Sequence, residues 1–337
     1  MGGRVYPRGV SDPEPIRFRA GDLTLAGELL LPDRAAPPDS GRQIPWVLLL
    51  PSWLPRDRDG AFDNGAHPAW FGVGPLAPHR PGLLRRLAEA LAEAGVASFR
   101  YDPRGCGESE GDWPMGDLFT RIDDARDALG AMRSRSELDL SRTGIIGHGE
   151  GAAIALSVAI ADPAVGALTL IGAPARSLRD LLRRGAAARA RSGKDREHPL
   201  VAALDRWSEE LIERAERREP ELILRLPDAA RERVTLNLAA WEQGFHTPAI
   251  ALATMLHRSV NLVHGAADAW SHPDESRLLE SVLAGAGNRA ALRPIAEAGH
   301  DLAEASDGVM AEIAQDLAGR LVTRPLPAVL LAIQQMG

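Results

Sequence analysis

One short segment constrains the fold of this chain more than any other. Residues 143–152 pass from an apolar strand, through a turn with glycine at every second position, into a helix of small residues. In a Gly-x-Ser-x-Gly turn, this layout presents a nucleophilic serine at the end of a strand in an α/β sheet. Here the middle residue is Gly149, which has no side chain. The segment therefore predicts an α/β sheet whose strand-to-helix turn lacks its nucleophile.

The sequence around this turn alternates between strand and helix patterns. An opening hairpin is predicted over 16–31, and the apolar run 47–50 predicts a strand buried on both faces. The other predicted elements are helices over 83–94, 117–133, 273–285 and 305–321, and strands over 96–101, 166–171, 260–263 and 290–295. This order implies a mostly parallel sheet with right-handed crossovers.

The alternation stops in the middle of the chain, which indicates an insertion. We interpret residues 175–257 as a helical lid inserted into an α/β core made of residues 15–174 and 258–322. Residues 323–337 form a C-terminal tail with a short apolar helix pattern that begins near a proline. This helix is predicted to pack on the body of the protein or on a second copy, as in a homodimer.

Composition excludes several classes of protein. The 337 residues are 45% hydrophobic, enough to bury a sizeable core, and the net charge of -7 argues against a nucleic-acid partner. No run of 18 apolar residues predicts a membrane span and no signal peptide is recognisable, so we expect a cytoplasmic protein. Cys106 is the only cysteine, and no set of histidine, cysteine and carboxylate residues has metal-ligand spacing. We therefore expect neither a metal nor another cofactor.

Three positions stand in an informative order along the chain. Gly149 lies at the glycine turn, Asp268 follows the end of one predicted strand, and His300 follows another. Nucleophile, acid and histidine is the chain order of the triad in enzymes built around a Gly-x-Ser-x-Gly turn.

On these residues the chain resembles the α/β-hydrolase superfamily, and more closely a lidded bacterial branch with a Gly-Ser-Gly-Pro-x-Asp-Arg-Asp-Gly loop. Residues 55–60 match the end of that loop, and residues 101–111 match the Asp-x-Arg-Gly-x-Gly-x-Ser turn of the branch. The resemblance covers about residues 15–320 and is weakest in the lid. It implies an α/β-hydrolase fold, with a mostly parallel sheet of the eight-stranded type flanked by helices and an inserted helical lid.

The resemblance also implies site residues. Asp268 and His300 would be catalytic, and the backbone amides of Glu150 and Trp53 would form an oxyanion hole. The serine of the family is replaced by Gly149, which removes the usual covalent step. The glycines of the loop are replaced by Ser52 and Leu54, so a narrower pocket is expected. Other predicted pocket residues are Ser52, His148, Trp241 and His246.

Four functions fit this pattern. In the favoured one, His300 supported by Asp268 is a general base for a non-hydrolytic reaction on an acylated small molecule. The resemblance suggests loss of acetate or another acyloxy group, or ring closure, in the tailoring of a polyketide intermediate. In the second, His300 activates water to hydrolyse an ester or thioester. The third is a ligand-binding module without catalysis, and the fourth is an ordinary serine hydrolase in which Gly149 is an engineered change.

Overall fold

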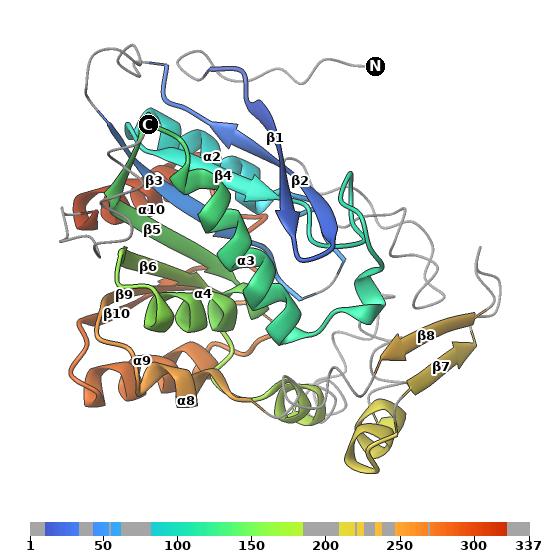
Figure 1. The fold of residues 1–337 in the computed structure, drawn as a ribbon. Coiled ribbons are helices and arrows are strands. Elements are labelled where there is room, and N and C mark those ends of the chain that lie inside the picture. Colours follow the sequence, from blue (N-terminus) through green and yellow to red (C-terminus); the bar gives the residue numbers. More distant parts are fainter. Residues whose placement is uncertain are drawn as a thin grey trace.

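A computed structural model gives the structure of the chain (Figure 1). It describes residues 11–33, 43–53, 55–61, 82–184, 209–219, 221–225, 233–237, 247–268 and 270–321. The predicted pocket residues Trp241 and His246, and the tail at 323–337, lie outside the described residues.

An eight-stranded sheet forms the centre of the molecule (Figure 1). Its strands, in spatial order, are β1 (Glu14–Ala20), β2 (Leu23–Leu30), β4 (Ala97–Tyr101), β3 (Ile44–Leu50), β5 (Leu138–His148), β6 (Val165–Ile171), β9 (Ser259–Gly265) and β10 (Ala290–Ile295). The β1–β2 and β2–β4 pairs are antiparallel and the other five are parallel. The mostly parallel sheet predicted from the alternating pattern is therefore confirmed.

Helices cover both faces of this sheet (Figure 1). On one face lie α2 (Leu83–Glu93) and α10 (Asp307–Arg320); on the other lie α3 (Leu118–Arg133), α4 (Glu150–Ala161), α8 (Ala249–Ala253) and α9 (Asp274–Gly285). Because side chains alternate along a strand, β3 sends Val47 and Leu49 into the first layer and Leu48 and Leu50 into the second. All four are completely buried, which explains why this strand is a continuous apolar run.

The segment predicted to be a helical lid is not entirely helical. It contains helical stretches at 178–184 and 209–216, and it also contains β7 (Glu221–Arg225) and β8 (Arg233–Asn237). These two strands pair antiparallel with each other, outside the main sheet, and lie beside the 3-10 helix η2 (Trp113–Met115). The prediction of a helical lid is therefore wrong for these two strands. Two antiparallel strands can hydrogen-bond to each other through a short connection, so they do not need the strand–helix alternation on which the prediction was based.

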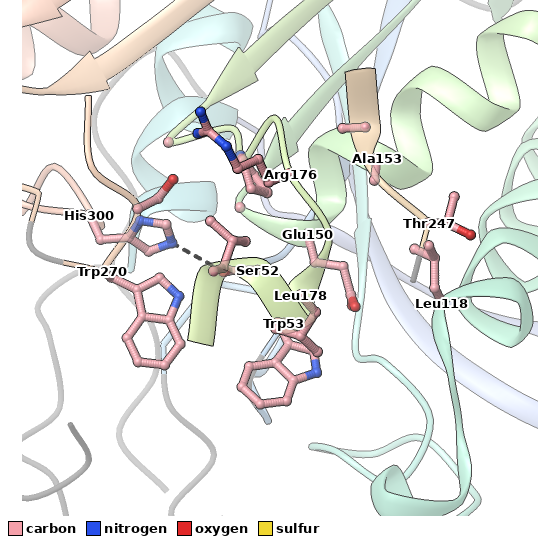
Figure 2. A pocket seen from close by; sticks show the side chains of 16 residues that line it. Ser52, Trp53, Leu118, Glu150, Ala153, Arg176, Leu178, Thr247, Trp270 and His300 are labelled. Carbon is pink, nitrogen blue, oxygen red and sulfur yellow. Dashed lines mark hydrogen bonds between the residues drawn. The ribbon is translucent and has the colours of Figure 1, made fainter. Parts of the chain in front are cut away.

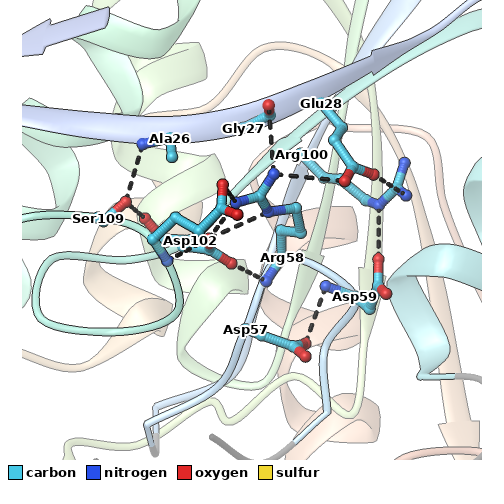
Figure 3. A network of polar contacts seen from close by, with 10 residues as sticks. Ala26, Gly27, Glu28, Asp57, Arg58, Asp59, Arg100, Asp102 and Ser109 are labelled. Atoms are coloured by element: carbon cyan, nitrogen blue, oxygen red, sulfur yellow. Dashed lines mark hydrogen bonds and ion pairs between the residues drawn. The ribbon is translucent and has the colours of Figure 1, made fainter. Parts of the chain in front are cut away.

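A buried network of ion pairs holds the loop between β3 and α2 against the sheet (Figure 3). Arg58 donates to Asp102 from its backbone N–H at 2.7 Å and from Nε at 3.0 Å, and it lies 3.3 Å from Glu28. Arg100 lies 2.7 Å from Glu28 and 3.0 Å from Asp59. These five side chains are at most 11% exposed. Residues 58 and 59 of this loop are therefore anchored beside β2 and the end of β4.

We predict that Arg58→Met destabilises the protein by about 3–5 kcal/mol, because it removes the guanidinium that pairs with the buried carboxylate of Asp102. The measurement is the free energy of unfolding in urea. The matched control is Arg126→Met, which breaks an exposed 3.1 Å pair with Asp123 and is expected to cost less than about 1 kcal/mol. Equal losses in the two variants would contradict a structural role for the network.

Candidate active site

The carboxyl edge of the sheet brings together side chains that are far apart in the sequence. Ser52 follows β3, Gly149 follows β5, Gly172 follows β6, Asp268 follows β9 and His300 follows β10. Since parallel strands end at the same edge, the turns that follow them meet there. The structure thus places the predicted Gly149, Asp268 and His300 in one site, and it adds Ser52 to them.

His300 is oriented by a buried carboxylate. Its Nδ1 lies 2.8 Å from Oδ2 of Asp268, whose side chain is fully buried. The other oxygen of Asp268 accepts hydrogen bonds from the backbone N–H groups of Trp270 at 2.8 Å and Ser271 at 2.9 Å. His264 Nε2 lies 3.1 Å from Oδ2 and supports the same carboxylate. His264 was missed by the sequence analysis, although its place near the end of β9 was a usable signal.

The charges of this pair set the protonation state of the imidazole. Burial alone would raise the pKa of Asp268, but the positive charge on His300 and hydrogen bonds from His264 and His300 hold it well below its ordinary value. Burial lowers the pKa of His300, and the Asp268 carboxylate outweighs this, so the net pKa is raised. A carboxylate only accepts hydrogen bonds, so Nδ1 carries the proton when His300 is neutral. Nε2 is then left as the basic atom.

We predict that Asp268→Asn lowers the pKa of His300, because the substitution removes the carboxylate that contributes most to raising this pKa against the effect of burial. An NMR titration of the His300 ring proton measures this shift. Asp123→Asn, on the exposed surface of α3, serves as the control and should leave the titration unchanged. An unaltered His300 pKa in Asp268→Asn would refute the assigned electrostatics.

Ser52 faces the basic atom of His300, a contact that the sequence analysis missed. Its Oγ lies 3.2 Å from Nε2, and Figure 2 shows the two side chains pointing toward each other. A β-carbon at position 149 would collide with this Oγ and lie 3.1 Å from His300 Nε2. The Ser52 hydroxyl thus fills the space that a side chain on Gly149 would need. The only signal in the sequence was that Ser52 replaces a glycine of the loop.

The turn around Gly149 keeps the backbone geometry of a nucleophile turn. Gly149 has φ +56°, a conformation that favours glycine. A β-carbon on Gly147 would collide with the backbone of Gly151, and one on Gly151 would lie 2.7 Å from two backbone oxygens of β3 and the following residue. The three alternate glycines therefore allow β5, the start of α4 and the end of β3 to approach closely.

The two predicted oxyanion-hole residues both border the pocket. Glu150 is the first residue of α4, where backbone N–H groups have no acceptor within the helix. Its side chain pairs with Arg121 at 3.1 Å; burial raises its pKa, and Arg121 partly opposes this. Trp53 is 5% exposed, and its ring stacks with Trp270 at 6.3 Å between centroids. The carboxylate of Glu150 is thus already engaged by Arg121.

His148 lies behind His300 and does not line the pocket, contrary to the prediction that it contacts substrate. Its side chain is fully buried, and its ring centroid is 4.6 Å from that of His300. His148 Nε2 donates to the backbone oxygen of His300 at 3.0 Å. Burial and the charge of His300 lower its pKa to about 3. A neutral His148 therefore supports the His300 backbone.

His148, His300 and Asp301 form a group close enough to be compared with metal ligands. Arg56 already pairs with Asp301 at 3.0 Å, and its positive charge opposes a cation there. His148 Nε2 is used as a donor, and both ring nitrogens of His300 face other partners. The chemistry of these donors does not fit a metal centre.

The pocket in front of His300 has mainly apolar walls (Figure 2). Its apolar lining includes Trp53, Leu118, Ala153, Leu178, Leu181 and Trp270. Its polar lining includes Ser52, Glu150, Arg176, Thr247, Ser271 and His300. Such a pocket suits a largely uncharged organic group with one reacting polar centre.

Comparisons with known proteins define the class of this chain. Residues 80–306 match the family described as serine aminopeptidase, S33. The match covers more than half of the chain, so the chain belongs to this family. Within the described residues, no helix combines the length and the apolarity that crossing a membrane requires. A search of curated protein sequences gives no significant match.

Solved structures show the same fold. Est1E from Butyrivibrio proteoclasticus, with ferulic acid bound, has a TM-score of 0.61 and 14% identity, covering 89% of this chain and 96% of that one. An esterase from Pyrococcus furiosus has a TM-score of 0.59 and 14% identity, covering 92% and 90%. The α/β hydrolase GrgF from Penicillium has a TM-score of 0.59 and 15% identity, covering 92% and 99%. The fold is therefore the α/β-hydrolase fold.

Proposed function

We propose that this protein hydrolyses carboxylic esters or thioesters, with His300 and Asp268 as its base. The observation that carries the proposal is the fixed orientation of His300: Nδ1 is held at 2.8 Å by a buried carboxylate, and Nε2 is directed into an apolar pocket. A positioned base of this kind contributes about 10²–10⁴-fold to a reaction rate.

The surroundings of His300 support acyl chemistry. Attack on an ester carbonyl develops negative charge on its oxygen, and backbone amides at the start of a helix can stabilise that charge. Glu150 and Trp53 supply such amide positions on the pocket border. The apolar walls favour an uncharged acyl group over a charged peptide terminus. The family name includes aminopeptidases, but the carboxylate of Glu150, which could hold a substrate ammonium group, is already paired with Arg121.

Loss of an acyloxy group, with formation of a carbon–carbon double bond, is the competing reaction, as in the tailoring of a polyketide intermediate. It would require His300 Nε2 to reach a C–H bond next to a carbonyl. Nε2 instead faces a hydroxyl at 3.2 Å, which favours proton transfer from oxygen. Ring closure onto the carbonyl uses the same base with a substrate hydroxyl as the attacking group, and it differs from hydrolysis only in the acceptor.

Oxygen labelling separates hydrolysis from elimination. With a β-acyloxy ketone as substrate in H₂¹⁸O, hydrolysis breaks the acyl–oxygen bond and places one ¹⁸O in the released acid. Elimination breaks the alkyl–oxygen bond and releases an unlabelled acid with an enone. We predict labelled acid, measured by mass spectrometry of both products. An unlabelled acid accompanied by enone would replace hydrolysis by elimination as the function.

We predict that turnover of an aryl ester increases with pH through the raised pKa of His300, because only the neutral imidazole accepts a proton. The midpoint of kcat/KM should therefore lie above about 6.5, and His300→Ala should lose about 10²–10⁴-fold. His257→Ala, which alters an exposed histidine, is the control. A His300→Ala enzyme with full turnover would end the proposal, whereas tight ligand binding without any turnover would favour a binding module.

A further inference from the structure

We propose that Ser52, in the loop after β3, is the nucleophile of this enzyme. It would carry out the covalent step for which Gly149 has no side chain. The inference rests on the proposed function of ester hydrolysis and adds a residue and a covalent intermediate to it. The nucleophile would then follow β3, as Ser52 does, and not β5, which Gly149 follows.

The first argument is the continuous chain of hydrogen bonds. Ser52 Oγ lies 3.2 Å from His300 Nε2, and His300 Nδ1 lies 2.8 Å from Asp268. Because the carboxylate fixes the proton on Nδ1, Nε2 has a free lone pair and the Ser52 hydroxyl donates to it. Serine, histidine and aspartate in this order are a nucleophile, its base and the group that orients the base.

The second argument is position. A β-carbon on Gly149 would lie 2.8 Å from the β-carbon of Ser52 and would collide with its Oγ. The hydroxyl of Ser52 therefore lies in the space that a side chain on residue 149 would need. A substrate carbonyl bound in front of α4 would therefore contact Ser52 close to the position of the serine in a Gly-x-Ser-x-Gly turn.

The third argument concerns the two amides of the oxyanion hole. In the usual arrangement, one donor is the residue after the nucleophile and the other comes from the loop after β3. With Ser52 as nucleophile, Trp53 becomes the residue after the nucleophile and Glu150 becomes the donor from the other segment. The two donors would exchange roles, and both residues line the pocket in front of His300.

The loop is held firmly enough to present a nucleophile. Ser52 is 8% exposed, and Arg56 donates to the backbone oxygen of Gly60 at 2.7 Å. The same guanidinium pairs with Asp301 at 3.0 Å, which ties the loop to the residue next to His300. A partly buried ion pair thus links the loop that carries the nucleophile to the residue beside the base, as preorganised catalysis requires.

The chemical steps balance in atoms and charge. Ser52 Oγ attacks the acyl carbon and its proton passes to His300 Nε2, while the carbonyl electrons move onto the oxygen. The tetrahedral species expels the alcohol or thiol, which takes the proton from His300, and leaves an acyl ester on Ser52. Water then attacks this ester and gives a proton to His300. The acid leaves, and the proton returns to Ser52 Oγ.

The test combines covalent labelling with substitution. A fluorophosphonate transfers its phosphonyl group to an activated serine and displaces fluoride, and peptide mass spectrometry locates the adduct. We predict the adduct on Ser52 and at least a 1,000-fold loss of kcat for an aryl ester in Ser52→Ala. The control is Ser98→Ala, which removes a buried hydroxyl that has no hydrogen-bond partner among the described residues and lies on β4.

Gly149→Ser provides a second variant that keeps Ser52. The new side chain would require Ser52 to move away from His300, so turnover and labelling of Ser52 should both fall. A gain of activity with the adduct on residue 149 would contradict the inference, because residue 149 would then be the more effective position for the nucleophile.

The outcomes distinguish this inference from the proposed function. If Ser52→Ala keeps turnover within tenfold of the parent, or if the active enzyme carries no adduct on Ser52, Ser52 is not the nucleophile. Loss of turnover in His300→Ala would then still support hydrolysis by activated water. Absence of any ester hydrolysis by the parent protein would instead remove the proposed function and the inference together.

Discussion

The candidate active site depends on a network of ion pairs beside it. Arg58 and Arg100 form these pairs with Glu28, Asp59 and Asp102. Charges removed from water are costly unless every one has a partner. This requirement anchors Arg58 and Asp59 beside β2 and the end of β4 (Figure 3). Ser52 and Trp53 lie a few residues earlier in the same loop, so the network holds the loop close to the residues that line the site.

The sequence was sufficient to predict the elements of the core and the meeting of Gly149, Asp268 and His300. Each of these residues directly follows a predicted strand, and the carboxyl ends of parallel strands share one edge. Local patterns were sufficient there because strand order and crossover handedness leave few arrangements. In contrast, β7 and β8 are two short strands that pair only with each other, and no periodic pattern in the surrounding sequence indicated them.

The contact between Ser52 and His300 is of another kind, since it joins residues 248 positions apart through the path of a loop. A loop path depends on side-chain contacts such as that between Arg56 and Asp301, and these have no local sequence signature. The replacement of a loop glycine by Ser52 indicated only a narrower pocket. In the structure, the hydroxyl that this replacement adds faces His300 and lies in the space that a side chain on residue 149 would need. Gly149 keeps the positive φ of the turn and provides the necessary space.

Two histidines with rings 4.6 Å apart also have opposite properties, and their carboxylate partners explain why. Asp268 contacts His300 directly, and its charge raises the pKa of that ring. Asp301 lies near His148, but Arg56 neutralises much of its charge, and burial keeps the pKa of His148 at about 3. A proton accepted by His300 is therefore not passed on to His148. It remains on the ring that faces Ser52, where it is available for the leaving group.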